Sequence, residues 1–218
     1  ALTAAGRPGE VPSLVWLIGA PGHEERVLEG IASVLGPDVP VAGGSSADDA
    51  VAGGWLQVAG QQVHADAVVL AVLFPSTAVG YAFHSGYSPT AVSGRVTAAA
   101  GRTVHAIDGE PAAAVYNRWT AGAVAAALPE GGNVLGDTTL FPLGREVGRF
   151  EQLPYYRLSH PEAITADGGL RLFSEIAVGD ELVLMQGSRE SLVSRAGRVA
   201  ESAMRSRAMA PEDVAGAL

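Results

Sequence analysis

Cysteine and lysine are both absent from the 218-residue sequence, and each absence excludes a group of mechanisms. Without cysteine there is no disulfide, no thiolate nucleophile and no zinc–thiolate site. All 14 basic residues are arginine, which excludes a Schiff-base lysine and the lysine of a phosphate-binding P-loop. The net charge of -9 argues against nucleic acid as a partner, because binding the phosphate backbone requires a basic face.

Long apolar runs and targeting signals are also missing. The longest apolar run, around residues 65–74, is far shorter than the roughly 20 residues of a membrane-spanning helix. Residues 1–10 lack the basic segment and apolar core of a signal peptide. The histidines show no spacing typical of metal ligands. We therefore expect a cytoplasmic protein with no membrane partner, no metal and no cofactor.

What the chain does contain is a sizeable core, since 48% of its residues are hydrophobic. Residues 13–19 form a continuous apolar run that predicts a buried strand. A helix follows, opened by Pro21-Gly22 and ended by Gly36-Pro37. Val39 to Ala42 then predicts a second buried strand. Because such crossovers join parallel strands, residues 13–42 predict a parallel strand–helix–strand unit.

The remaining pattern is dominated by hairpins. We expect an α/β to α+β fold of mixed, largely antiparallel sheets flanked by helices. The turn-rich residues 129–137 predict a boundary between a first half, 1–135, and a second half, 136–218. The predicted elements are hairpins over 55–64 and 94–107, a fully buried strand over 67–73, strands over 79–87, 153–158, 169–176 and 181–186, a helix over 111–128, and a final helix capped by Ser188.

A run of small and polar residues follows the predicted strand at 39–42. Gly43 and Gly44 free the backbone, so that Ser45, Ser46 and Asp48 are presented at a strand end, where α/β proteins tend to bind ligands. The alternative is a tight turn whose hydroxyls and carboxylate satisfy their own backbone, and both interpretations stay open. The run lacks the second glycine of the Gly-x-Ser-x-Gly motif, which argues against a serine hydrolase.

Two further candidate sites combine aromatic and titratable side chains. His84 stands beside a flexible glycine and Tyr87, although a lone strand histidine is more often a surface or core residue. Arg157 follows Tyr155 and Tyr156, and an arginine flanked by aromatics can clamp a carboxylate bidentately. The alternative for Arg157 is an exposed strand arginine paired with an acid such as Glu175.

Several spaced motifs resemble the FIST domain, a bacterial sensory module with an N-terminal and a C-terminal half. The glycine-rich step at 40–48 and the hairpin and helix start at 96–112 are similar to motifs of its first half. The motifs Phe141-Pro-Leu-Gly144, Asp167-Gly-Gly-Leu170 and Gly179-Asp-Glu-Leu-Val-Leu-Met185 resemble its second half. Since the family usually has more sequence before residue 13 and after the final helix, we expect either a fragment or a reduced version of the domain, incomplete at both ends.

The resemblance implies a sensory domain that binds a small polar ligand, with amino acids among the ligands, and that works with a signalling partner protein. We expect no catalysis. In this interpretation Arg157 or Arg145 faces a ligand carboxylate, and Asp48 faces an ammonium group.

Two alternatives remain beside the sensory domain. One is a hydrolase that uses Ser45 or Ser46 with His84, which requires an imidazole within hydrogen-bonding distance of a hydroxyl. The other is a structural or interaction module without a ligand pocket, which would expose a large apolar patch.

Overall fold

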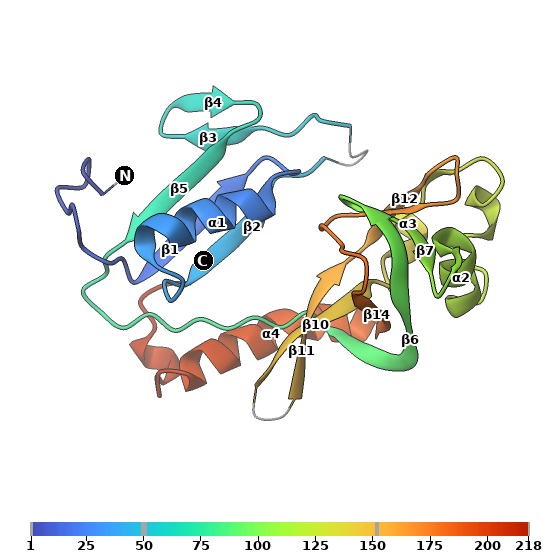
Figure 1. Cartoon of the computed structure of the whole chain (residues 1–218). Helices are drawn as coiled ribbons and strands as arrows, with labels where there is room; N and C mark the ends of the chain where they lie inside the picture. The colour runs from blue at the N-terminus through green and yellow to red at the C-terminus, as the bar shows by residue number, and fades with distance from the viewer. Residues whose placement is uncertain (1, 49–51, 151–152, 218) are drawn as a thin grey trace. The chain divides into compact units, whose positions relative to one another are not determined.

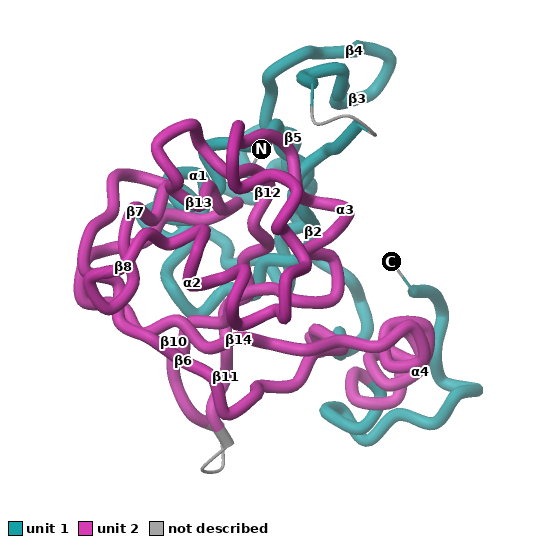
Figure 2. The backbone as a smooth tube through the Cα atoms, turned by 90° about the vertical axis from the view of Figure 1, so that its right-hand side faces the viewer, with its two compact units in different colours: residues 1–81, 204–218 teal, residues 82–203 magenta. Residues whose placement is uncertain are grey.

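The computed structural model describes residues 2–48, 52–150 and 153–217 of the chain. It has an α+β fold with 22% of the residues in helices and 35% in strands, and the sheets are mostly antiparallel. The predicted fold class is thus confirmed. The backbone separates into two compact units: residues 1–81 with 204–218 (unit 1), and residues 82–203 (unit 2), as Figure 2 shows. The predicted division at residue 135 stays a prediction.

Unit 1 is built on the predicted strand–helix–strand unit. Strand β1 (Leu14–Gly19) pairs in parallel with β2 (Val41–Ser45) and antiparallel with β5 (Val68–Leu73). Helix α1 (Glu24–Leu35) covers one face of this sheet (Figure 1). Its buried Ile31 packs in one cluster with Val15 and Val39. The apolar spacing of the sequence thus gives the parallel pair that it predicts.

Strand β2 differs from the prediction in an informative way. The strand does not stop before the glycines but continues through Gly43, Gly44 and Ser45. Gly43 pairs with Leu17 at a φ of 132°, and a Cβ on Gly43 would lie 1.8 Å from the Leu17 carbonyl oxygen. Only glycine fits this register, because any side chain would overlap the neighbouring backbone. The glycine therefore permits the strand pairing here and does not end it.

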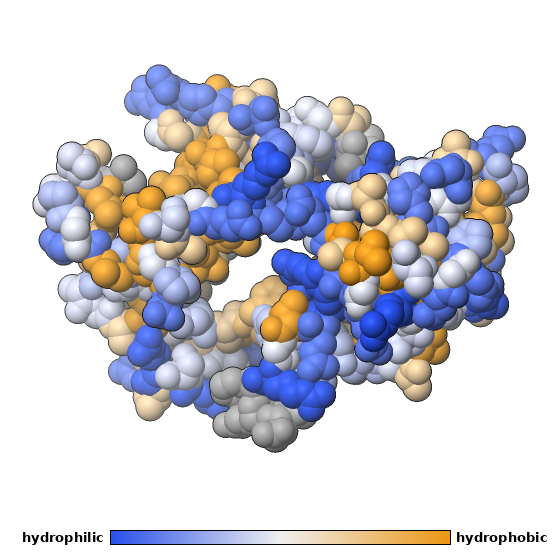
Figure 3. All heavy atoms as spheres, viewed as in Figure 1, coloured by the Kyte–Doolittle hydropathy of each residue, from blue (hydrophilic) through white to orange (hydrophobic). Residues whose placement is uncertain are grey.

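The rest of unit 1 is a small hairpin and an edge strand. Strands β3 (Gln57–Ala59) and β4 (Gln62–His64) form the predicted hairpin. The prediction that β5 is fully buried is wrong, since Val68 is 46% and Leu70 is 39% exposed. β5 lies at the edge of the sheet order β2-β1-β5, where one side has no neighbouring strand among the described residues. Figure 3 shows apolar side chains gathered over this part of the molecule.

Unit 2 contains a nine-stranded antiparallel sheet with the order β11-β10-β14-β6-β7-β13-β12-β9, and β8 pairs with β7. Its α-helices are α2 (Ala112–Trp119), the short α3 (Leu135–Thr138) and α4 (Arg189–Arg205), whose last two residues belong to unit 1, and a 3-10 helix, η1, spans Ala125–Ala127. The strands are β6 (Tyr87–Ala100), β7 (Thr103–Ile107), β8 (Glu110–Pro111), β9 (Gly132–Asn133), β10 (Leu143–Phe150), β11 (Leu153–Ser159), β12 (Pro161–Ile164), β13 (Leu170–Leu172) and β14 (Glu181–Gly187).

The core of unit 2 surrounds a fully buried tyrosine on α2. The Tyr116 hydroxyl donates a hydrogen bond of 2.7 Å to the carbonyl of Phe141, and burial raises the pKa of Tyr116. Strand residues such as Val96 and Leu170 pack in the same cluster. The hydroxyl finds a partner, as a buried polar group must, and so ties α2 to the segment before β10.

Three predicted elements of unit 2 are wrong in extent. Residues 79–85 form no strand, and β6 begins only at Tyr87. The helix predicted over 111–128 ends at Trp119, because Ala121 and Gly122 have φ values of 52° and 97° that turn the chain. The strand predicted over 169–176 is the short β13. The capping prediction at Ser188 is confirmed: its hydroxyl accepts a hydrogen bond from the Ser191 amide at 3.0 Å.

Candidate functional site

The polar side chains of the predicted binding loop form hydrogen bonds within unit 1. The Ser45 hydroxyl donates to Glu24 at 2.7 Å, and the Ser46 hydroxyl accepts from the Gln57 amide at 3.2 Å. The Asp48 carboxylate accepts from the amides of Ala52 and Gly54, at 2.9 and 2.6 Å. Only the Asp48 carboxylate satisfies neighbouring backbone, as in the tight-turn interpretation, whereas the two hydroxyls bind side chains that are distant in the sequence.

Three other predicted residues meet at one place in unit 2. His84, Tyr87 and Tyr156 line a cavity of about 340 Å³. Four aromatic rings border it, because Phe83 and Tyr155 line it as well. The remaining lining residues are Ser85, Pro89, Pro154 and Met185. No Asp, Glu, Lys or Arg is among these lining residues. The cavity is therefore apolar and aromatic, with a few hydroxyls and one imidazole.

Two glycines make room for the aromatic rings. Gly187 on β14 pairs with Tyr87 on β6, and a Cβ on Gly187 would lie 2.6 Å from the Tyr87 ring. Gly144 on β10 plays the same part for Tyr156, whose ring atom Cδ1 would lie 3.2 Å from a Cβ on Gly144. That Cβ would also lie 2.7 Å from the sulfur of Met185. The sheet thus lets the two tyrosine rings and the Met185 thioether lie against backbone that carries no side chain.

Tyr87 is fixed by its hydroxyl. This group donates a hydrogen bond of 2.8 Å to the carbonyl of Thr139, and it lies 3.2 Å from Nε2 of His160. The two rings meet edge to face, with centroids 5.5 Å apart. Burial lowers the pKa of His160, against a smaller opposing effect of its hydrogen bond to Thr139, and burial raises the pKa of Tyr87. The back of the cavity is therefore an ordered network of neutral groups.

Two aromatic residues at the rim of the cavity are exposed. Phe83 is 65% and Tyr155 is 46% exposed, and their rings meet edge to face with centroids 6.4 Å apart. Nε2 of His84 lies 3.0 Å from the Ser202 hydroxyl on α4. Large aromatic side chains that remain exposed as a group mark binding surfaces more often than single exposed residues do. The rim is therefore open to a ligand from solvent.

The two predicted arginines are not part of this cavity. Arg145 and Arg157 lie opposite each other in the pairing of β10 with β11, and neither is a lining residue. Arg145 forms an ion pair with Asp180, whose carboxylate also accepts a hydrogen bond from the Ala177 amide. This pair fixes the turn before β14, so it accounts for Arg145 without a ligand.

The sequence analysis missed a different arginine, on α4. Nη1 of Arg195 donates to the carbonyl of Ser85, a lining residue, at 3.3 Å. One turn earlier, the Ser191 hydroxyl donates to the carbonyl of Gly86 at 2.8 Å. The spacing of four residues is the signal that places Ser191 and Arg195 on one face of a helix. Their partners, the carbonyls of Gly86 and Ser85, are far away in the sequence, so no local sequence pattern indicates these contacts.

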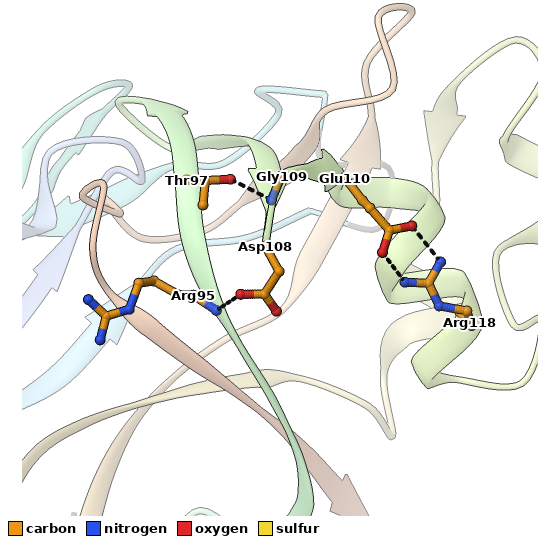
Figure 4. A network of polar contacts seen from close by, with 6 residues as sticks. All are labelled: Arg95, Thr97, Asp108, Gly109, Glu110 and Arg118. Carbon is orange, nitrogen blue, oxygen red and sulfur yellow. Dashed lines mark hydrogen bonds and ion pairs between the residues drawn. The ribbon is translucent and has the colours of Figure 1, made fainter.

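The polar residues around Asp108 have a structural role (Figure 4). The Asp108 carboxylate accepts from the Arg95 amide at 3.0 Å, and Asp108 itself has a φ of 51°. The Gly109 amide donates to the Thr97 hydroxyl at 3.0 Å. These bonds close the turn between β7 and β8, and the salt bridge between Glu110 and Arg118 then joins this turn to α2.

Metal and membrane features are absent from the part of the chain that the structure describes. In the ranges 2–48, 52–150 and 153–217, no three His, Asp or Glu side chains gather as metal ligands would. No helix of these ranges has both the length and the apolar character needed to span a membrane.

Comparison with known proteins gives matches along the whole chain. Residues 3–110 match the family model described as the FIST N domain, and residues 112–218 match that of the FIST C domain. An uncharacterised protein of Methanocaldococcus jannaschii, MJ1623, is 34% identical over 98 residues. This match covers 44% of the chain described here and 18% of MJ1623. No solved structure matches the chain.

Proposed function

Since this chain belongs to the FIST family of sensory domains in signal transduction, we propose that it senses a small molecule bound in the aromatic cavity of unit 2. The protein binds this ligand and does not transform it. Amino acids are among the candidate ligands, as the family resemblance implies. The cytoplasmic location and the signalling partner protein stay predictions.

The observation that carries the proposal is the open aromatic cavity itself. Its volume of about 340 Å³ lies at the lower end of the range of small-molecule pockets. Its back is ordered by the bonds of Tyr87, whereas its rim leaves Phe83 and Tyr155 exposed. A ligand that covers these two rings removes apolar surface from water, which favours binding.

The loop at 43–48 is a weaker candidate for the ligand site. The hydroxyls of Ser45 and Ser46 and the Asp48 carboxylate already have protein partners in unit 1. A ligand that binds these groups has to replace those hydrogen bonds, with little net gain. The cavity of unit 2 requires no such replacement, because its rim consists mainly of aromatic carbon.

A thermal-shift screen of the 218-residue chain tests the proposal, with the amino acids, small carboxylates and small amines as ligands. A ligand present at about 100 times its Kd is expected to stabilise the protein by about 2.7 kcal/mol. Phe83→Ala and Tyr155→Ala should reduce the shift without unfolding the protein, because both side chains are exposed.

The matched control is Tyr81→Ala, which removes an aromatic side chain that is 52% exposed and does not line the cavity. This variant should keep the full shift. The proposal is wrong if no compound raises the melting temperature, or if both cavity variants keep the shift of the wild type.

A further inference from the structure

The aromatic cavity has a positively charged side chain at its border that the protein does not neutralise. Arg195 donates to the carbonyl of Ser85, and this is its one hydrogen bond among those of the described residues. It has no ion pair in the described part of the chain. A guanidinium group carries five N–H donors in a planar fork, so most of the donors of Arg195 remain available.

The acidic residue that faces a lining residue across the strands already has a partner. No acidic residue lines the cavity. Glu146 lies opposite Tyr156 in the pairing of β10 with β11, but its carboxylate accepts from Nε of Arg149 at 2.8 Å. A cation in the cavity would therefore find no carboxylate, and it would be repelled by Arg195. An anion would find a charge of the opposite sign.

We propose that the ligand is a small carboxylate that bears a flat ring, with the ring against Phe83 and Tyr155 and the carboxylate on Arg195. This inference rests on the proposed function, since it names the class of ligand for the same cavity. The ring contributes aromatic contacts, and the carboxylate forms charge-assisted hydrogen bonds with the guanidinium. An ammonium group adds no favourable contact, so ring-bearing acids bind at least as well as the matching amino acids.

Four probes that share one ring separate these contributions, and calorimetry gives their Kd values. 3-Phenylpropionate has the carboxylate alone, phenethylamine has the ammonium alone, L-phenylalanine has both, and 3-phenylpropan-1-ol has neither. We expect 3-phenylpropionate and L-phenylalanine to bind at least about tenfold more tightly than the alcohol, which is the usual contribution of a hydrogen bond to a charged group. Phenethylamine should bind more weakly than the alcohol.

Substitution of Arg195 provides a second test of the inference. Arg195→Gln should remove the preference for 3-phenylpropionate while leaving the affinity for the alcohol unchanged. Arg198→Gln is the matched control, because Arg198 lies one turn further along α4 and bonds only to Ser194 and Ser191 among the described residues. It should keep the preference for the acid.

The outcomes distinguish the inference from the proposed function. If the alcohol binds as tightly as the acid, or if Arg195→Gln keeps the preference for the acid, the inference is overturned. The cavity is still supported as the ligand site in that case if Phe83→Ala weakens binding. If a cation binds most tightly, the inference is likewise wrong. If none of the four probes and no compound of the screen binds, the proposed function itself fails.

Discussion

The ring of Tyr87 lies against the backbone of Gly187, its partner across strands β6 and β14. A Cβ on Gly187 would come within 2.6 Å of one ring atom of Tyr87 and within 2.7 Å of the next. The same ring is also held by the hydrogen bond of its hydroxyl to Thr139. The position of Tyr87 in the cavity thus depends on a residue without a side chain.

We expect Gly187→Ala to destabilise the protein by about 1–3 kcal/mol, because the added methyl group forces the Tyr87 ring from its place. Urea denaturation measures the loss. Gly148→Ala on β10 is the matched control, since a Cβ there meets no atom within 4 Å, and it should leave stability nearly unchanged. Equal stability of the two variants would show that Tyr87 is not held against Gly187.

A second prediction concerns the strand pairing in unit 1. Gly43→Ala should cost at least about 2 kcal/mol, because the new Cβ overlaps the Leu17 carbonyl at a φ that side chains rarely adopt. Gly44→Ala, one residue later, meets no atom within 4 Å and should cost much less. Denaturation of both variants, followed by circular dichroism, gives the two free energies of unfolding to be compared. A Gly43→Ala variant as stable as Gly44→Ala would contradict the pairing of β1 with β2 described here.

The third prediction is a pH dependence due to His160. Burial lowers the pKa of this imidazole below its usual value of 6.5. The unfolded chain therefore binds a proton at a pH where the folded protein does not. The stabilisation is fully present above pH 6.5 and is lost as the pH falls toward the lower pKa of the folded state, with a slope of up to about 1.4 kcal/mol per pH unit.

His160→Gln removes the titrating group but keeps an amide near the Thr139 carbonyl. Urea denaturation at several pH values between 8 and 5 (about the range in which histidine titrates) compares the two proteins. The free energy of unfolding of the wild type should fall more steeply with acid than that of the variant. A difference between them that stays constant with pH would show that His160 is not buried as a neutral group.

Local patterns in the sequence suffice for much of the fold. The parallel pair β1–β2, the hairpin β3–β4 and the capped start of α4 all depend on residues close to one another in the chain. Gly43 could not be placed in the same way. Two successive glycines indicate a break in a strand, and only the approach of the Leu17 carbonyl reveals why glycine is needed inside β2. That contact is tertiary.

Some members of the candidate site were predictable from the sequence, but their assembly was not. His84, Tyr87 and Tyr156 each stood out by residue type, yet their meeting depends on the order in which β6, β14, β10 and β11 pair. Arg195 could be placed on a helix face from its spacing but not beside the cavity, because it contacts a carbonyl 110 residues away in the sequence. The charge of Arg145 and Arg157 suggests that they bind a ligand carboxylate, but neither residue lines the cavity.

The two glycines under the cavity bear on how related chains could differ in the ligands that they select. An alanine at Gly144 would press on Met185 and Tyr156, and an alanine at Gly187 would press on Tyr87. Either change would narrow the space without altering any residue that contacts the ligand. Selectivity among relatives can therefore diverge at positions that a comparison of contact residues would overlook. The absence of side chains at Gly144 and Gly187 therefore helps to set the size of the ligand that this cavity can accept.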